Sequence, residues 1–223
     1  SSDVCSSDLS FEVPAGHTQV SEAVDQSMLL ALADVVRDAT VAFENYDHTK
    51  ALELAEKFFW NFTDDYLELV KERAYGQGGA TTATQASAAL ALRKALHVML
   101  RLFAPFLPFA TEEVWGWWQK NAGSIHRSNW PTVAELTEGL DAGNHGLMEL
   151  ASVALFGLRK AKSDAKASMK AEVISATLQA PAAALTSVRL FESDLKAVGR
   201  IAELSLAEAT EVQVTDVVLE VAS

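Results

Sequence analysis

The sequence has very little cysteine and no long apolar run, and each absence excludes a class of protein. A single cysteine, Cys5, excludes an internal disulfide, so we expect the reducing cytoplasm as its compartment. No apolar stretch approaches the roughly 20 residues that a membrane-spanning helix needs, so we expect no membrane partner. The start has neither the basic nor the apolar part of a secretory leader, and we expect none there.

An excess of basic residues is also missing. The formal net charge is −12, which by itself argues against a nucleic-acid partner, because a polyphosphate favours a basic surface. The charge is unevenly distributed, however. Residues 1–56 hold eleven acidic and two basic residues, whereas residues 57–127 hold six acidic and eight basic ones. Residues 159–170 hold five basic residues and one acidic residue, so we expect any anionic partner at the later segments.

Signatures of catalysis and of metal binding are absent as well. The five histidines are scattered, and none has a cysteine or carboxylate at the spacing of metal ligands. No nucleophile and base can be paired from the sequence. The glycine-rich residues 76–79 lack the lysine and the strand-then-helix context of a phosphate loop, so they predict a connector. We therefore expect no catalytic residue, no metal and no cofactor in this stretch.

The most informative segment that is present runs from Asp47 to Gly76. Its apolar residues recur at a spacing of three and four, which predicts one long helix with a buried face. That face holds Leu52, Ala55, Phe59, Phe62, Tyr66 and Leu69. Further apolar residues, including Trp60 and Val70, widen the stripe, so we expect cover on more than one side. A helix of this kind predicts a helical bundle.

Two more long helices are expected on either side of this one. Ser21 is a candidate cap for a helix over residues 22–43. After a connector at residues 76–85, a third helix is expected over residues 86–104. The side of this third helix opposite its apolar face carries a basic stripe of Arg93, Lys94, His97 and Arg101.

The chain then breaks at Pro105 and Pro108, because proline removes a donor and clashes inside a helix. Thr111 is a candidate cap for the next helix, with two glutamates in the first turn, where the helix dipole favours them. Residues 123–131 are expected to form an extended loop.

The pattern changes near residue 143. A helix over residues 147–166, a strand over 172–178 and a helix over 181–198 are expected, followed by strands over 201–206 and 212–221. The predicted fold is therefore mainly α, a helical bundle followed by a small α+β domain. The expected divisions are a disordered or non-native tail at residues 1–8, the bundle at 9–142 and the α+β domain at 143–223.

Three ordered blocks resemble one protein family. They are FFWNFTDDYLELVKERA at Phe58–Ala74, RLFAPFLPFATEEVW at Arg101–Trp115 and GSIHRSNWP at Gly123–Pro131. Together they resemble the helical anticodon-binding domain of class I aminoacyl-tRNA synthetases for branched aliphatic amino acids. The aspartate before Tyr66 and the lead Asp47, Ala51, Leu52 and Glu53 favour the valyl members over the isoleucyl ones. The segment Leu158–Val173 looks like the family's adjoining α+β domain.

The chain departs from the family in three ways. The helix that opens the family's bundle, ending in a segment similar to Leu9–Phe11, is missing, and SSDVCSSD stands in its place. The long coiled-coil arm of many members is missing after Ser223. The H-I-G-H and K-M-S-K-S signatures of the catalytic domain are also absent, and Lys166–Lys170 has similar letters in the wrong order. ATP and magnesium are therefore implied only for a catalytic domain that this stretch lacks.

The resemblance implies recognition of the anticodon stem-loop of a valine tRNA, through phosphate contacts from lysine and arginine and through base contacts. The candidate contacts are Lys57, Lys71, Arg93, Lys94, Arg101, Arg159, Lys160, Lys162, Lys166 and Lys170. Each can instead be a solvated helix residue. The tryptophans Trp60, Trp115, Trp117 and Trp118 can stack on bases or simply fill the core.

Two alternatives stay open from the residues alone. One is the equivalent piece of an isoleucyl enzyme. The other is a free-standing acidic helical adaptor that binds protein, which the net charge of −12 favours. For the synthetase interpretation we expect a monomer whose further partner is the catalytic domain of the same enzyme.

Overall fold

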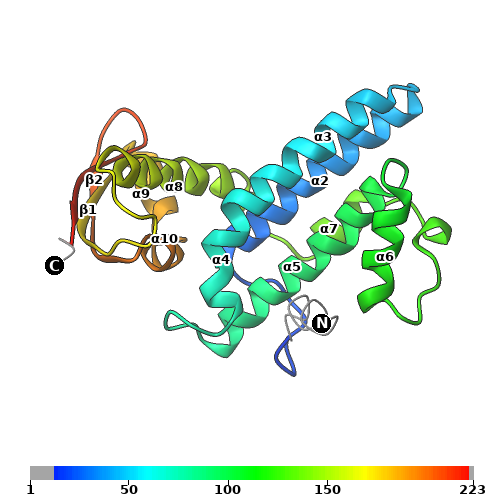
Figure 1. Cartoon of the computed structure of the whole chain (residues 1–223), viewed down its shortest axis with the longest axis horizontal. Helices are drawn as coiled ribbons and strands as arrows, with labels where there is room; N and C mark the ends of the chain where they lie inside the picture. The colour runs from blue at the N-terminus through cyan, green and yellow to red at the C-terminus, as the bar shows by residue number, and fades with distance from the viewer. Residues whose placement is uncertain (1–12, 221–223) are drawn as a thin grey trace.

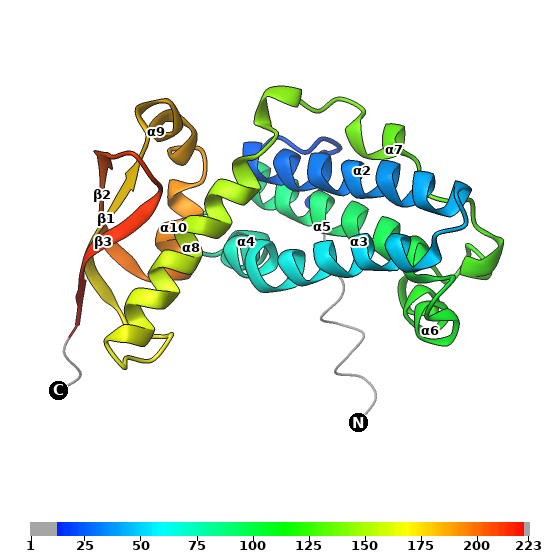
Figure 2. The same ribbon diagram turned by 90° about the horizontal axis from the view of Figure 1, so that it is seen from above.

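The computed structural model describes residues 13–220. A helical bundle comprises α2 (Ala23–Glu44), a long helix from His48 to Ala74, α5 (Thr82–Phe103) and α6 (Pro108–Trp118). A smaller unit with a sheet follows it (Figures 1 and 2). The mainly α architecture with an α+β unit is therefore confirmed. The tail expected at residues 1–8, Cys5 and the segment Leu9–Phe11 lie outside the described residues.

Helix α2 matches its predicted range within a residue, but its predicted cap is wrong. The first turn begins after Glu22, and no side chain of the preceding residues caps it. Instead, the Ser87 hydroxyl on α5 accepts hydrogen bonds from the backbone N–H groups of Ser21 and Glu22, at 3.1 and 2.9 Å. The Glu22 N–H belongs to the N-cap residue, and the Ser21 N–H precedes it. Ser87, 66 residues after Ser21, therefore satisfies the two backbone donors that come just before the first turn.

The segment predicted as one long helix is continuous but not uniform. It consists of α3 (His48–Asn61), a π-helical turn (Phe62–Tyr66) and α4 (Leu67–Ala74). A π turn adds one residue to the helical period, so residues beyond it present a rotated face. Tyr66 and Val70 are fully buried, whereas Trp60 of α3 is 54% exposed. The prediction that this helix is covered on more than one side is wrong at Trp60.

Helix α5 begins four residues earlier than predicted. Thr81 and Thr84 form a reciprocal capping box, in which each side chain bonds to the other's backbone N–H. The connector is correspondingly shorter than expected. The buried face of α5 consists largely of alanines, at Ala88, Ala91 and Ala95. Their small side chains let α2 and α3 pack closely against α5.

Helix α6 begins at Pro108 and not at Thr111, so Thr111 is not its cap. Proline is favoured in the first helical turn because that position needs no N–H donor. Thr111 lies within the first turns of the helix and is buried from solvent, and its hydroxyl donates to the Leu107 carbonyl at 2.9 Å. The loop expected after α6 is present, with a single 3₁₀ turn at Ile125–Arg127. A short helix α7 (Val133–Thr137) and a 3₁₀ turn (Ala142–Asn144) follow, and neither was predicted.

The α+β unit contains α8 (Leu147–Asp164), β1 (Val173–Ala180), α9 (Ala182–Val188), α10 (Glu192–Gly199), β2 (Ile201–Glu208) and β3 (Gln213–Leu219). The sheet order is β2-β1-β3, with β1 parallel to β2 and antiparallel to β3. The single helix predicted over 181–198 is two helices, because the chain turns between them to bury both Val188 and Phe191. Helices α8 and α10 lie between the sheet and the bundle (Figure 2).

The hydrophobic core crosses the predicted division at residue 143. Ala151 and Ala154 of α8 belong to the same buried cluster as Val24 and Leu32 of α2. Farther along α8, Leu158 packs in a second cluster with β1 and β2. Helix α8 thus contributes to both cores and joins the two units. In the described part of the chain, no helix is long and apolar enough to cross a bilayer.

Candidate nucleic-acid interface

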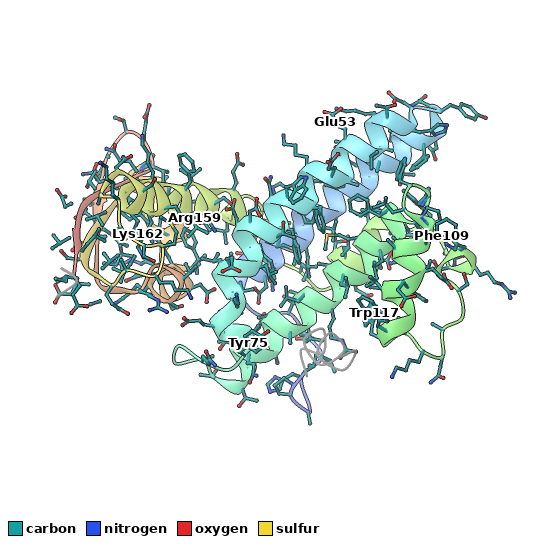
Figure 3. The ribbon with its side chains drawn as sticks, in the orientation of Figure 1. Glu53, Tyr75, Phe109, Trp117, Arg159 and Lys162 are labelled. Atoms are coloured by element: carbon teal, nitrogen blue, oxygen red, sulfur yellow. The ribbon has the colours of Figure 1, made fainter. Side chains whose placement is uncertain are left out.

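A groove of about 660 Å³ lies where α4 of the bundle meets α8 and α10 of the α+β unit. One wall is α4 with the residues that follow it, and the other is α8 with the turn after α10. Residues far apart in the sequence line it, among them Tyr75 after α4 and Arg159 and Lys162 on α8, which Figure 3 labels. The basic residues that line the groove are Lys71, Arg159, Lys162, Lys170 and Arg200.

Three of these basic residues are available to a ligand. Lys71 and Lys170 are exposed, and Lys71 forms an ion pair with Glu68 on the same helix, at 3.3 Å. Arg200 is exposed and pairs with Glu172 at 3.2 Å. Exposed pairs of this kind contribute about 0–1 kcal/mol, so a phosphate can replace the carboxylate at little cost. The groove therefore offers three movable cations around one hollow.

Arg159 is held more firmly in the wall of the groove. Its Nη1 donates to Asp65 Oδ1 at 2.8 Å, and its Nη2 donates to the backbone carbonyl of Asp64. Both acceptors lie in the π-helical turn, where the Thr63 hydroxyl also donates to the carbonyls of Phe59 and Trp60. Arg159 thus braces the π turn against α8, and its charge is already partly neutralised.

Lys162 was predicted as a contact residue, and the structure places it inside the fold. Its side chain is buried, and Nζ donates to three backbone carbonyls, those of Met169, Ala171 and Gly199, at 2.8–3.1 Å. Burial, followed by the neighbouring Arg200 charge, lowers the pKa of Lys162. All three ammonium donors are used, so Lys162 has none left for a phosphate. It instead ties the loop before β1 to the end of α10.

Arg101 is likewise committed to the fold, which corrects the expected exposed stripe on α5. Its side chain is buried and forms a 2.6 Å ion pair with Glu135 of α7. It also donates to the carbonyls of His97 and Asn129. Burial opposes ionisation of Glu135, but the hydrogen bonds from Arg101 and from Thr132 outweigh it and lower the pKa of the Glu135 carboxyl. Arg101 anchors the loop after α6 and does not face solvent.

The remaining candidates lie outside the groove. Arg93, Lys160 and Lys166 are exposed and Lys94 is half-buried, all on helix surfaces or at a helix end. Lys57 is exposed and lines a separate hollow of about 360 Å³ beside α2 and the start of α8. The structure therefore brings together only part of the predicted set.

The tryptophans divide between core and surface. Trp115 is buried, stacks on His97 at a ring distance of 5.0 Å and donates to the Gly123 carbonyl. Trp60 and Trp117 are exposed, and their indole N–H groups donate to Glu56 and Glu113 on their own helices. The Trp118 indole N–H is buried without a hydrogen-bond partner in the described residues. None of the four lines the basic groove.

Arg200 is the groove residue that the sequence did not indicate. It follows α10 in a left-handed conformation, with φ of 53°, and closes the helix by a turn. Nothing in the local pattern distinguishes it from other surface arginines, since it meets Lys71 and Lys170 only through the packing of α10 on α4. Within residues 13–220, no cluster of three or more histidine, cysteine or acidic side chains could hold a metal ion.

Comparison with known proteins agrees with this architecture. Residues 25–178 match the family model described as the anticodon-binding domain of tRNA ligase. The valine–tRNA ligase of Leifsonia xyli subsp. xyli is 49% identical over 215 residues, covering 95% of this chain and 24% of that protein. That of Thermobifida fusca is 52% identical over 185 residues, covering 83% of this chain and 20% of the relative.

A third relative, the valine–tRNA ligase of Salinispora tropica, is 49% identical over 204 residues, covering 85% of this chain and 23% of its own length. The chain thus spans about a fifth to a quarter of these relatives. The family model covers more than half of the chain, including the bundle, α8 and most of β1. This chain therefore belongs to the anticodon-binding domain family of tRNA ligases.

Proposed function

We propose that this chain is the tRNA-binding part of a valine–tRNA ligase and that it holds the anticodon arm of valine tRNA. The resemblance to valine–tRNA ligases along most of the chain supports the choice of amino acid. The groove with Lys71, Lys170 and Arg200 supports the contact, because movable cations around a hollow fit a phosphodiester backbone.

In this proposal the chain orients the tRNA and the chemistry takes place elsewhere. Activation of valine with ATP and magnesium belongs to a catalytic domain outside this stretch, which is the other proposed partner. The proposal further includes a monomer that works in the cytoplasm. The net charge of −12 does not oppose RNA binding at the groove, because basic residues outnumber acidic ones in its lining, by five to the two residues Glu68 and Glu72.

A salt series tests the proposal. Binding of valine tRNA to the full chain is measured by filter binding, with an isoleucine tRNA and a tRNA of unrelated anticodon as competitors. We expect preference for valine tRNA and a logarithmic affinity that falls linearly with the logarithm of salt concentration. Equal affinity for all three tRNAs would contradict anticodon recognition. No detectable binding at low salt would favour the acidic adaptor.

Charge-reversal variants test whether the RNA contacts the basic residues of this groove. The double variant Lys71→Glu with Lys170→Glu should weaken binding and flatten the salt dependence by roughly 0.7–0.9 per lost phosphate contact. The matched control is Lys160→Glu with Lys166→Glu, which makes the same charge change on exposed residues outside the groove. An equal loss in both double variants would show that general charge, and not this groove, attracts the RNA.

A further inference from the structure

A buried ion network joins the bundle to the α+β unit. The Arg73 guanidinium on α4 lies between Asp25 of α2 and Asp194 of α10. Its Nη1 and Nη2 donate to the two Asp25 oxygens at 2.8 Å each, and its Nε donates to Asp194 Oδ1 at 2.9 Å. Nη2 also bonds to Asp194 Oδ2, and Nη1 to the Thr84 carbonyl. All five N–H donors of the arginine are thereby satisfied.

The three charged side chains are shielded from water. The side chains of Arg73 and Asp194 are each 8% exposed, and that of Asp25 is 0% exposed. A buried charge that loses its partner is costly, because no water replaces the lost bonds. The two carboxylates have different structural roles, however. Asp25 connects α4 to another helix of the bundle, whereas Asp194 is the one that reaches across to the α+β unit.

The network connects α4, which forms one wall of the groove, to α10, whose end and following turn belong to the other wall. Arg73 is two residues from Lys71 on α4, and Asp194 is six residues before Arg200 at the end of α10. Helices α4 and α10 lie against each other where the two units meet (Figure 2). The position of α10 on α4 therefore sets how far Arg200 stands from Lys71.

We propose that Asp194, through its bonds to Arg73, is a positioning residue for RNA binding that holds the two walls of the basic groove at a fixed separation. This inference rests on the proposed function, since Asp194 would shape the same groove that the proposed function assigns to RNA binding. Asp194 itself touches no RNA in this proposal. It acts only through the placement of α10.

The first test is Asp194→Asn in the full chain. The amide keeps the shape of the side chain but loses the charge that pairs with Arg73. We expect valine tRNA to bind roughly 2- to 30-fold more weakly, the range by which residues that touch no ligand modulate affinity. Glu192→Gln is the matched control, because it removes the same charge from the same helix without touching Arg73. Circular dichroism of both variants reports whether the helices are intact.

A disulfide between the loop after α4 and α10 tests whether the position of α10, and not the charge of Asp194 itself, determines the affinity for tRNA. A Cβ atom built on Gly78, in the loop after α4, lies 3.7 Å from the Cβ atom of Ala197 on α10. This separation falls within the 3.5–4.5 Å range of disulfides. The pair Gly78→Cys and Ala197→Cys is added to Asp194→Asn, with Cys5→Ser to remove the rival thiol. Reduction of the same molecule supplies the control for strain at Gly78, where φ is +64°.

The expected result is that the oxidised, stapled variant regains the affinity of the natural sequence and loses it again on reduction. Weak binding in both redox states would overturn the proposal, as would an Asp194→Asn variant that binds as tightly as the natural sequence. A natural chain that binds no tRNA would instead contradict the proposed function. The two failures are therefore distinguished by the unmodified protein.

Discussion

The hydroxyl of Tyr66 donates a 2.8 Å hydrogen bond to Oδ1 of Asp25, in the centre of the bundle. Both residues are 0% exposed. Asp25 also accepts from Arg73 through both of its oxygens and from the Ser87 hydroxyl at 2.6 Å. One carboxylate thus connects α2 to the π-helical turn, to α4 and to α5. Burial, with the Asp25 charge next, raises the pKa of the Tyr66 phenol well above its usual value, so the phenol remains a donor.

Tyr66→Phe should destabilise the protein by about 0.5–1.5 kcal/mol, the usual net contribution of one hydrogen bond. The loss is at this modest level because three other donors still satisfy Asp25. Urea unfolding measures it. Tyr46→Phe, at a residue that is 85% exposed, is the control and should shift stability by less than about 0.5 kcal/mol. Equal effects of the two changes would show that the buried hydroxyl is not a specific contact.

His97 should make the stability of the bundle depend on pH. Burial, with the neighbouring Arg101 charge next, lowers the pKa of its imidazole, and Nδ1 faces Arg101 Nη2 at 3.2 Å. The unfolded chain then binds more protons than the folded chain below about pH 6.5, so stability falls as pH falls through that range.

The thermal midpoint, measured between pH 7.5 and pH 5, should therefore decrease less in His97→Gln than in the natural sequence. His48→Gln, at an exposed position of α3, provides the comparison and should keep the natural slope. The assignment to His97 is wrong if its replacement leaves the pH dependence unchanged.

Lys162→Met should destabilise the α+β unit by about 1–3 kcal/mol, because it leaves the buried Gly199 carbonyl and two partly buried carbonyls without their donor. Methionine has a similar length, so the change removes hydrogen bonds more than volume. The matched control is Lys160→Met on the same helix, which is exposed and should cost less than about 0.5 kcal/mol. Guanidinium unfolding followed by circular dichroism compares them. If the two variants unfold alike, the carbonyl contacts contribute nothing.

Helices and strands could be predicted wherever the pattern is local. The ranges of α2, α8 and β1 agree with the sequence within two residues, because apolar periodicity is a property of neighbouring residues. The capping predictions at Ser21 and Thr111 were wrong for a non-local reason. Ser87 from another helix satisfies the backbone donors of Ser21 and Glu22 before α2, and a proline three residues before Thr111 begins α6.

For the candidate site, only its basic composition could be predicted from the sequence, and not which residues would meet. The excess of lysine and arginine within residues 57–127 and 159–170 pointed to segments that line the groove, and Lys71, Arg159 and Lys170 do meet there. Arg200 could not be predicted, because its place depends on how α10 packs on α4. Nor could the π turn, which forms where α8 braces the long helix through Arg159.

By itself, the amino-acid sequence determined the long helices, the strands and the family, since these depend on periodicity and on runs of specific residues. Only the tertiary structure decided which charges are free. Lys160 and Lys162 are two residues apart in the same basic cluster, yet the first is exposed and the second is buried against three carbonyls. The physical reason is that burial and hydrogen-bond partners come from distant segments, such as the end of α10, whose approach no local pattern records.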